Sequence, residues 1–256
     1  MYQILSYIKF ILSSTNQHGV HSPFVYNFVT KCLYNRTKYD AYKALYTYRK
    51  KLKKSKTKIE VIDLGEGSKL LKTNQRRVSK MIRNSSSSFK NAKLLFKTTK
   101  YFNFKTILEL GTSLGMGTYA MAIADTSSKI ISIEGCPNTL GFTNSYLRQY
   151  NLKHLSFING DFQSTIQKLN EDKFDCVFID GHHNKKSTIN YFESLLSKTH
   201  NNTVFVFDDI YWSKGMTEAW AYIKAHPSVS VTVDTFHLGY VFFRKEQAKE
   251  HFKIRV

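Results

Sequence analysis

The sequence predicts an α/β domain built on a mostly parallel sheet of seven strands, with an antiparallel hairpin near its C-terminus and a helical cap before it. From residue 105 onwards, short apolar, β-rich runs alternate with amphipathic stretches, as in βα units of a parallel sheet. The runs at 228–236 and 238–245 are too close for a helical crossover, which predicts a hairpin. Before residue 105, apolar residues recur mainly at helical spacing. We therefore expect a helical region over 1–104 and the sheet domain over 105–256.

The individual elements follow from the same patterns. In the N-terminal region, 6–34 and 89–104 have helical periodicity, and only 59–65 resembles a strand. In the sheet domain, the apolar runs predict five parallel strands and the stretches after them predict five helices. The strands are expected at 105–111, 129–135, 154–160, 174–181 and 202–209, and the helices at 118–125, 143–151, 162–170, 188–198 and 216–226.

Length and composition indicate one globular domain with an appendage, because the chain has 256 residues of which 42% are hydrophobic. The apolar stretch at 1–12 contains Lys9, is too short to span a bilayer and lacks a signal-peptide cleavage pattern. We expect an amphipathic helix there and a cytoplasmic protein. The three cysteines lack metal-type spacing and imply no disulfide framework.

The formal net charge of +19 favours partners such as nucleic acid, anionic membrane surfaces or acidic small molecules. Much of the excess lies at 48–58 and 74–83. Two interpretations stay open. One is a solvated basic face on a helical region, and the other is an RNA-binding patch, because lysine and arginine neutralise phosphates independently of sequence.

Acidic and histidine side chains end the predicted parallel strands. In an open parallel sheet, ligands bind beyond the carboxyl ends of the strands, so these residues form the candidate site. Like charges at every strand end would be costly unless ligands or a metal ion used them. Glu134 lies about 20 residues beyond the glycine turn at 111–115, where nucleotide-type sites place an acid on the ribose. The set comprises Glu109, Gly111, Glu134, Asp161, Asp180, His182, His183, Asp208 and Asp209.

The turn at 111–115 has a competing interpretation. Its G-x-S-x-G pattern fits the nucleophile elbow of α/β-hydrolases, with Ser113, Asp208 and His237 in the chain order of a catalytic triad. That elbow sits in mid-sheet, however, whereas only one strand is predicted before it. A second glycine-containing stretch, 61–68, also resembles a nucleotide-binding turn, but no strand ending in an acid follows it at the right spacing. We interpret it as structural or as a loop near the pocket.

Over residues 105–245, these motifs resemble class I S-adenosylmethionine-dependent methyltransferases, whose sheet is Rossmann-like. The resemblance implies that the turn passes the methionine part of the cofactor, Glu134 binds the ribose, and Asp161 with Phe162 lies by the adenine. Ser113 replaces the middle glycine of the usual turn, as in the catechol and caffeoyl-CoA O-methyltransferase branch. Segments 18–26 and 208–220 are similar to a bacterial methyltransferase group. The implied cofactor-binding residues are Glu109, Gly111, Thr112, Ser113, Gly115, Glu134, Asp161, Phe162 and Asp180.

The same branch holds a divalent metal, which implies Mg²⁺ at Asp180, Asp208 and Asp209, with Asp209 where the branch usually has asparagine. Oxygen ligands of this kind suit Mg²⁺, and the ion would activate an acceptor oxygen. Alternatively, Asp208 and Asp209 cap the following helix. Asp180, His182 and His183 are the candidate catalytic residues, because an imidazole there can act as base or as metal ligand.

Tyr211 and Trp212 are candidates for the wall of the acceptor pocket, or for the core. His18 and His21 flank a turn, where they either cover the substrate mouth or stabilise the turn.

The predicted function is methyl transfer from S-adenosylmethionine to an oxygen of a small-molecule acceptor, with region 1–104 supplying much of the acceptor pocket. One alternative is an RNA methyltransferase that uses the basic N-terminal region. Another is a non-catalytic binding protein on the same fold.

Overall fold

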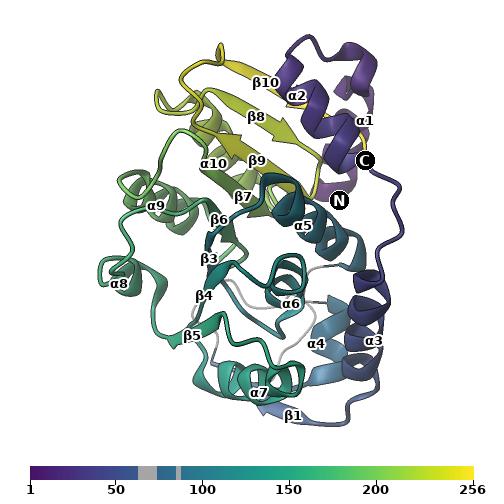
Figure 1. Ribbon diagram of the computed structural model, residues 1–256, viewed down its shortest axis with the longest axis vertical. Coiled ribbons are helices and arrows are strands. Elements are labelled where there is room, and N and C mark those ends of the chain that lie inside the picture. The colour runs from purple at the N-terminus through teal and green to yellow at the C-terminus, as the bar shows by residue number, and fades with distance from the viewer. Residues whose placement is uncertain (63–73, 85–87) are drawn as a thin grey trace. The chain divides into compact units, whose positions relative to one another are not determined.

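The computed structural model describes residues 1–62, 74–84 and 88–256, which form two compact units (Figure 1). The first unit joins Met1–Asn35 to Ile166–Val256, and the second is Arg36–Thr165. Each unit is described by itself. Most of the glycine-containing stretch noted at 61–68 lies outside the described residues.

The second unit contains three parallel strands in the order β3-β4-β5 and a separate antiparallel pair, β1 with β2. Strands β3 and β4 are mostly buried because both of their faces carry apolar side chains, for example Ile107 and Leu108 in β3 and Ile130 and Ile133 in β4. Strand β5, at the edge, is only partly buried. The elements are α3 (Ala41–Lys54), β1 (Lys58–Glu60), β2 (Gln75–Arg77), α4 (Val78–Asn84), α5 (Phe89–Phe102), β3 (Thr106–Leu110), α6 (Met116–Ala122), β4 (Lys129–Glu134), α7 (Pro137–Leu147), η3 (Arg148–Tyr150), β5 (Leu155–Asn159) and α8 (Phe162–Ile166, which ends at the first residue of the other unit).

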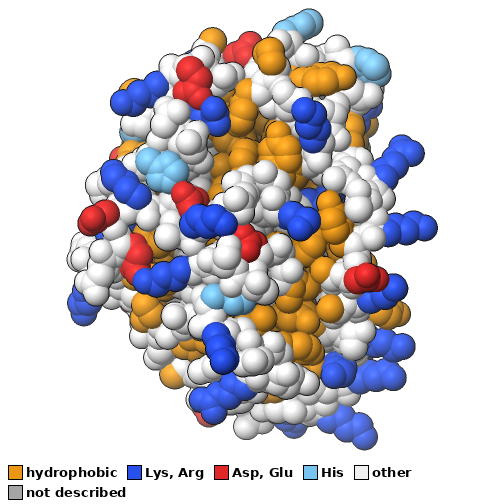
Figure 2. Space-filling model, viewed as in Figure 1, with side chains coloured by type: hydrophobic (Ala, Val, Ile, Leu, Met, Phe, Trp, Pro, Cys, Tyr) orange, Lys and Arg blue, Asp and Glu red, His pale blue; other side chains and the backbone are white. Residues whose placement is uncertain are grey.

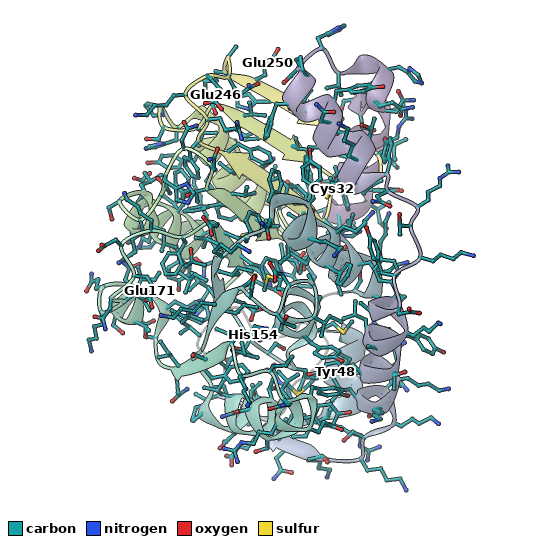
Figure 3. All side chains as sticks on the ribbon, viewed as in Figure 1. Cys32, Tyr48, His154, Glu171, Glu246 and Glu250 are labelled. Atoms are coloured by element: carbon teal, nitrogen blue, oxygen red, sulfur yellow. The ribbon has the colours of Figure 1, made fainter. Side chains whose placement is uncertain are left out.

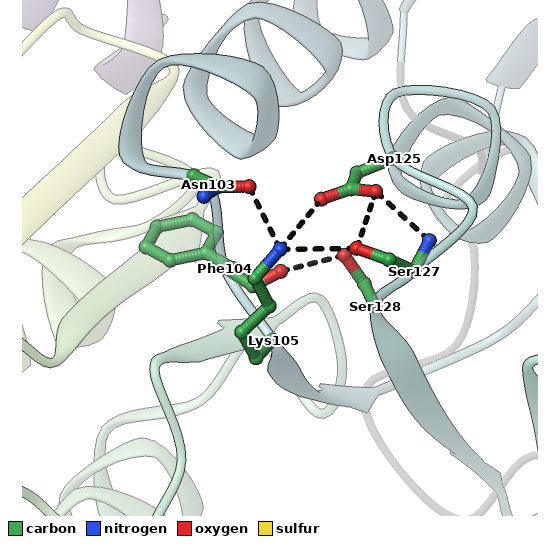
Figure 4. Close-up of polar contacts among 6 residues, drawn as sticks. All are labelled: Asn103, Phe104, Lys105, Asp125, Ser127 and Ser128. Carbon is green, nitrogen blue, oxygen red and sulfur yellow. Dashed lines mark hydrogen bonds and ion pairs between the residues drawn. The ribbon is translucent and has the colours of Figure 1, made fainter.

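A polar cluster fixes where β3 and β4 begin (Figure 4). The Lys105 Nζ donates to Asn103 Oδ1 at 3.0 Å and to Ser127 Oγ at 3.0 Å, and it lies 3.4 Å from Asp125 Oδ2. The Ser128 hydroxyl donates to the Phe104 carbonyl at 2.6 Å. These bonds tie the two strand starts together and so support the register in which Leu110 of β3 pairs with Ile133 of β4, the residue before Glu134.

The first unit contains five strands in the order β10-β8-β9-β7-β6. Strands β6 and β7 are parallel, β9 runs antiparallel to both β7 and β8, and β10 runs parallel to β8. Large aromatic side chains fill this core, and fully burying each contributes roughly 1.5–3 kcal/mol. The elements are α1 (Tyr2–Ser13), η1 (Gln17–Gly19), α2 (Pro23–Asn27), the π-helix η2 (Phe28–Leu33), β6 (Cys176–Ile179), α9 (Lys185–Leu196), β7 (Val204–Asp208), α10 (Lys214–Ala225), β8 (Val231–Asp234), β9 (Leu238–Phe242) and β10 (Glu250–Lys253).

The predicted α/β class with its C-terminal antiparallel hairpin is confirmed, and the hairpin is formed by β8 and β9. In the described part of the chain the main sheet has eight strands, β3 to β10, rather than seven. The additional strand, β10, was missed because its sequence, Glu250-His251-Phe252-Lys253, is polar and only partly buried. The division at residue 104 stays a prediction.

Helix α1 is more exposed than its predicted amphipathic character implies. Only Phe10 is buried, whereas Ile4 and Leu12 are 66% and 82% exposed. No helix in residues 1–62, 74–84 and 88–256 combines the length and the apolar character that crossing a bilayer requires. The cytoplasmic location stays a prediction.

Candidate active site

The turn between β3 and α6 has an unusual backbone. Gly111, Ser113 and Gly115 have φ angles of 105°, 48° and 70°. Such left-handed conformations suit glycine but cost another residue about 1–2 kcal/mol. Ser113 therefore needs contacts from its surroundings to hold it there.

Glu134, at the end of β4, holds the amide side of this turn. Its Oε2 accepts the Ser113 N–H at 2.8 Å, and its Oε1 accepts the Cys136 N–H at 3.0 Å. The half-buried carboxylate thus bridges the turn after β3 and the start of α7.

Tyr48 and Thr143 hold the carbonyl side of the turn. The Thr143 hydroxyl donates to the Ser113 carbonyl at 2.7 Å, and the Tyr48 hydroxyl donates to the Leu114 carbonyl at 2.6 Å. Tyr48 lies on α3 (Figure 3) and is fully buried, and this burial raises the pKa of its phenol well above the usual value, which keeps it a neutral donor. A Cβ on Gly115 would lie 2.9 Å from the Tyr48 hydroxyl and 2.8 Å from a Thr143 methyl group. Glycine is therefore required at this position.

The sequence motifs did not point to Tyr48 or Thr143. Tyr48 begins a strongly basic stretch and looks like part of a solvated face. Its spacing from Leu45 and Leu52, three and four residues away, marks the inner face of a helix and is the signal that could have found it.

Glu109 is a buried residue that stabilises the same turn through hydrogen bonds. It is only 1% exposed, and its Oε2 accepts the hydroxyls of Thr118 and Ser132, each at 2.5 Å. The Ser132 and Thr112 hydroxyls also hydrogen-bond to each other at 2.6 Å. Glu109 thereby links β3, β4, α6 and the turn, and its predicted contact with a cofactor stays a prediction.

Asp161 and Phe162 follow β5, the strand beside β4. Asp161 is exposed, and its Oδ1 accepts the Ser164 N–H at 2.9 Å at the start of α8, whereas Phe162 is buried. The Gly160 N–H donates to the Glu134 carbonyl at 3.1 Å. The structure therefore brings the Glu134 and Asp161 segments together, as the sequence predicts for neighbouring parallel strands.

The end of β1 also contacts this region. The Asn138 side-chain amide donates to the Glu60 carbonyl at 2.9 Å, and the Ile62 N–H donates to Cys136 Sγ at 3.3 Å. The chain thus enters the second glycine-containing stretch from a point next to the turn that Glu134 binds.

In the first unit, Asp180 and His183 form a pair after β6. His183 Nε2 lies 3.6 Å from Asp180 Oδ1, within ion-pair distance, and the His183 ring centroid is 6.1 Å from that of Trp212. His182 differs, because its backbone is left-handed, with φ 59°, and its Nδ1 is 2.5 Å from the Tyr191 hydroxyl. Of the two predicted histidines, His183 is the one beside the carboxylate.

Asp208 and Asp209 end the neighbouring strand β7. Asp208 is 5% exposed and its Oδ1 accepts the Asp209 N–H at 3.0 Å. Asp209 has φ 52°, and its Oδ1 is 4.0 Å from His237 Nδ1. Neither aspartate caps α10, because Ser213 is its N-cap and accepts the Met216 N–H. The alternative of a helix cap is therefore wrong.

The three aspartates do not fit a metal ion in this arrangement. Across residues 1–62, 74–84 and 88–256, no three His, Cys, Asp or Glu side chains are grouped so that they could hold one. Asp180 and Asp209 instead each lie within ion-pair distance of a histidine. Mg²⁺ requires a near-octahedral shell of oxygen atoms, and the predicted site at Asp180, Asp208 and Asp209 is not supported.

Other predicted residues lie outside these groups. Tyr211 is a structural residue, because its hydroxyl donates to Asp234 Oδ2 at 2.6 Å and its ring stacks on Phe236. His18 and His21 are exposed.

One family model matches part of the chain. Residues 108–210 match a family model described as a methyltransferase domain. No curated protein sequence matches the chain. The predicted resemblance to S-adenosylmethionine-dependent methyltransferases is confirmed, and nothing in the match favours the hydrolase interpretation.

Several solved structures share the fold at low sequence identity. The S-adenosylhomocysteine-bound methyltransferase PaMTH1 of Podospora anserina is 15% identical, has a TM-score of 0.62 and covers 88% of this chain and 97% of its own. An O-methyltransferase of Bacillus cereus in complex with S-adenosylhomocysteine is 17% identical, with a TM-score of 0.56 and coverage of 81% and 92%. The O-methyltransferase TomG of Streptomyces achromogenes, involved in tomaymycin synthesis and bound to S-adenosylmethionine, is 15% identical, with a TM-score of 0.57 and coverage of 81% and 91%.

Proposed function

We propose that this chain, whose residues 108–210 match a methyltransferase domain, transfers a methyl group from S-adenosylmethionine to an oxygen atom of a small-molecule acceptor. The observation that carries the proposal is the Glu134 carboxylate at the carboxyl end of β4, which accepts the backbone N–H of Ser113 in the glycine turn and that of Cys136. An acid at the end of the strand after a glycine turn is the group that binds ribose hydroxyls in nucleotide-type sites. The O-methyltransferases among the structures of similar fold support oxygen as the methylated atom.

The residues of the second unit divide the binding of the cofactor between them. Glu134 binds the ribose hydroxyls, and the turn from Gly111 to Gly115 passes the methionine part, because glycine at its left-handed positions lets a backbone come close to a ligand. Asp161 and Phe162 contact the adenine. When bound, the cofactor supplies an electrophilic methyl group on a sulfonium ion.

His183 is the proposed general base for the acceptor hydroxyl. Because its Nε2 faces Asp180, its Nδ1 accepts the proton, and the carboxylate stabilises the positive charge that forms on the ring. Trp212 beside it offers a flat apolar wall, which suits an aromatic acceptor such as a phenol or a catechol.

Removing divalent metal ions is expected to leave turnover unchanged to within about twofold, because catalysis by a positioned base needs no metal and the aspartates do not converge on one. The measurement is methyl transfer to catechol from labelled S-adenosylmethionine, before and after dialysis against a chelator. A loss that added Mg²⁺ restores would reinstate the three aspartates as metal ligands.

Replacing Tyr48 with phenylalanine is expected to weaken the binding of S-adenosylhomocysteine by about fivefold, because one hydrogen bond contributes about 1 kcal/mol. The ring still packs against Tyr119, but the Leu114 carbonyl loses its donor. Calorimetric titration measures the change. Tyr119→Phe is the matched control, because it removes a hydroxyl from the same aromatic cluster. An equal effect of both substitutions would contradict a specific role for Tyr48 in positioning the turn.

A further inference from the structure

Positive charge is concentrated in one part of the second unit. Residues 36–100 contain twenty Lys and Arg but only four Asp and Glu, whereas residues 101–165 contain four of each kind. All sixteen excess positive charges of this unit thus lie in 36–100. A surface that is merely solvated normally carries positive and negative charges interspersed, so solvation alone does not require such an imbalance.

The fold gathers part of this charge on one surface, which we call the basic face. Its six members are exposed and come from elements that are packed together, α3 with α4 and α4 with β2. Helix α3 buries Leu45, Tyr48 and Leu52 on its inner side, which turns its lysines outward. Figure 2 shows Lys and Arg side chains gathered along the edge where Figure 1 places α3. The basic face comprises Lys50, Lys51 and Lys54 of α3, Arg77 of β2, and Lys80 and Arg83 of α4.

An aromatic ring accompanies these cations. Tyr46 is 56% exposed, and the Lys50 Nζ lies 5.8 Å from its ring centroid. Among the described residues of 36–100, Tyr46 and Ile62 are the large hydrophobic side chains that are exposed. Membrane-surface helices bury a row of apolar side chains in the acyl region, and the basic face has no such row in this part of the chain. Cations around an exposed ring instead match surfaces that bind single-stranded nucleic acid.

We propose that the basic face binds single-stranded RNA, with its lysines and arginines on the phosphates and Tyr46 stacked on a base. RNA is the natural ligand for such a surface because its loops and ends leave bases unpaired and open to stacking. The inference goes beyond methyl transfer and does not rest on it, since the binding of RNA is a property of α3, β2 and α4 whatever the acceptor is.

The test compares two triple variants in fluorescence anisotropy with a labelled single-stranded RNA of mixed sequence across a salt series. Lys50→Gln, Lys51→Gln and Lys54→Gln together should weaken binding at low salt at least about tenfold and reduce the magnitude of the salt slope by about two. Lys168→Gln, Lys186→Gln and Lys245→Gln remove the same charge from exposed positions of the other unit and should leave both quantities nearly unchanged. Tyr46→Ala should weaken binding to single-stranded RNA more than to duplex RNA.

Thermal melting and the titration with S-adenosylhomocysteine show that each variant is folded, and they keep this test separate from that of the cofactor site. An absence of RNA binding at low salt would overturn the proposal, as would equal losses in the two triple variants. Binding to phosphatidylglycerol vesicles in place of RNA, lost in the α3 triple variant, would assign the basic face to anionic lipid instead.

Discussion

Replacing Glu134 with alanine is expected to weaken the binding of S-adenosylhomocysteine by at least about a hundredfold, because hydrogen bonds to a charged group contribute about 1.5–3 kcal/mol each and two would be lost. A second effect adds to the first. The Ser113 and Cys136 amides lose the carboxylate that they share, and Ser113 loses a contact that keeps its backbone left-handed. Calorimetric titration measures the change.

Glu134→Gln separates the two effects. The amide keeps one oxygen for a backbone N–H but turns an NH₂ group towards the other, so an intermediate affinity is expected. Asp125→Asn is the matched control, because Asp125 lies just before the start of β4, at the opposite end of the strand, and binds Lys105 and Ser127 (Figure 4). Unchanged affinity in a folded Glu134→Ala variant would remove Glu134 from the cofactor site and with it the main support for methyl transfer.

The parallel strands and the hairpin could be predicted because each is an apolar run whose burial the sequence makes evident. The grouping of Glu134 with the glycine turn and with Asp161 was also predictable. Parallel strands bring their carboxyl ends to one edge, so that residues far apart in the chain become neighbours once the strand order is known.

Other features depend on tertiary contacts that leave little trace in the sequence. Strand β10 is polar, so its hydropathy does not predict a strand. Its backbone pairing with β8 holds it in the sheet. Tyr48 reaches the Leu114 carbonyl from a helix 66 residues earlier in the chain, and no motif marks such a contact. The metal prediction relied on carboxylates at two strand ends, whereas the conformation of each aspartate after its strand decides whether their oxygens converge. Asp209, with its left-handed backbone, lies near His237 instead.

Replacing His183 with glutamine is expected to lower kcat by about a hundredfold to ten-thousandfold, the usual contribution of a general base. The affinity for S-adenosylhomocysteine should stay unchanged, because His183 acts on the acceptor. The measurement is the steady-state rate of methyl transfer to catechol from S-adenosylmethionine.

Two further variants distinguish a base from a residue that merely supports the fold. His182→Asn removes the neighbouring imidazole, which bonds to Tyr191, and asparagine tolerates the left-handed backbone there, so kcat should change little. Asp180→Asn removes the charge that stabilises the protonated ring and should lower kcat less than His183→Gln does. If His182→Asn lowered kcat by the larger factor and His183→Gln left it nearly unchanged, the base would be His182. The bond between His182 and Tyr191 would then orient the catalytic ring.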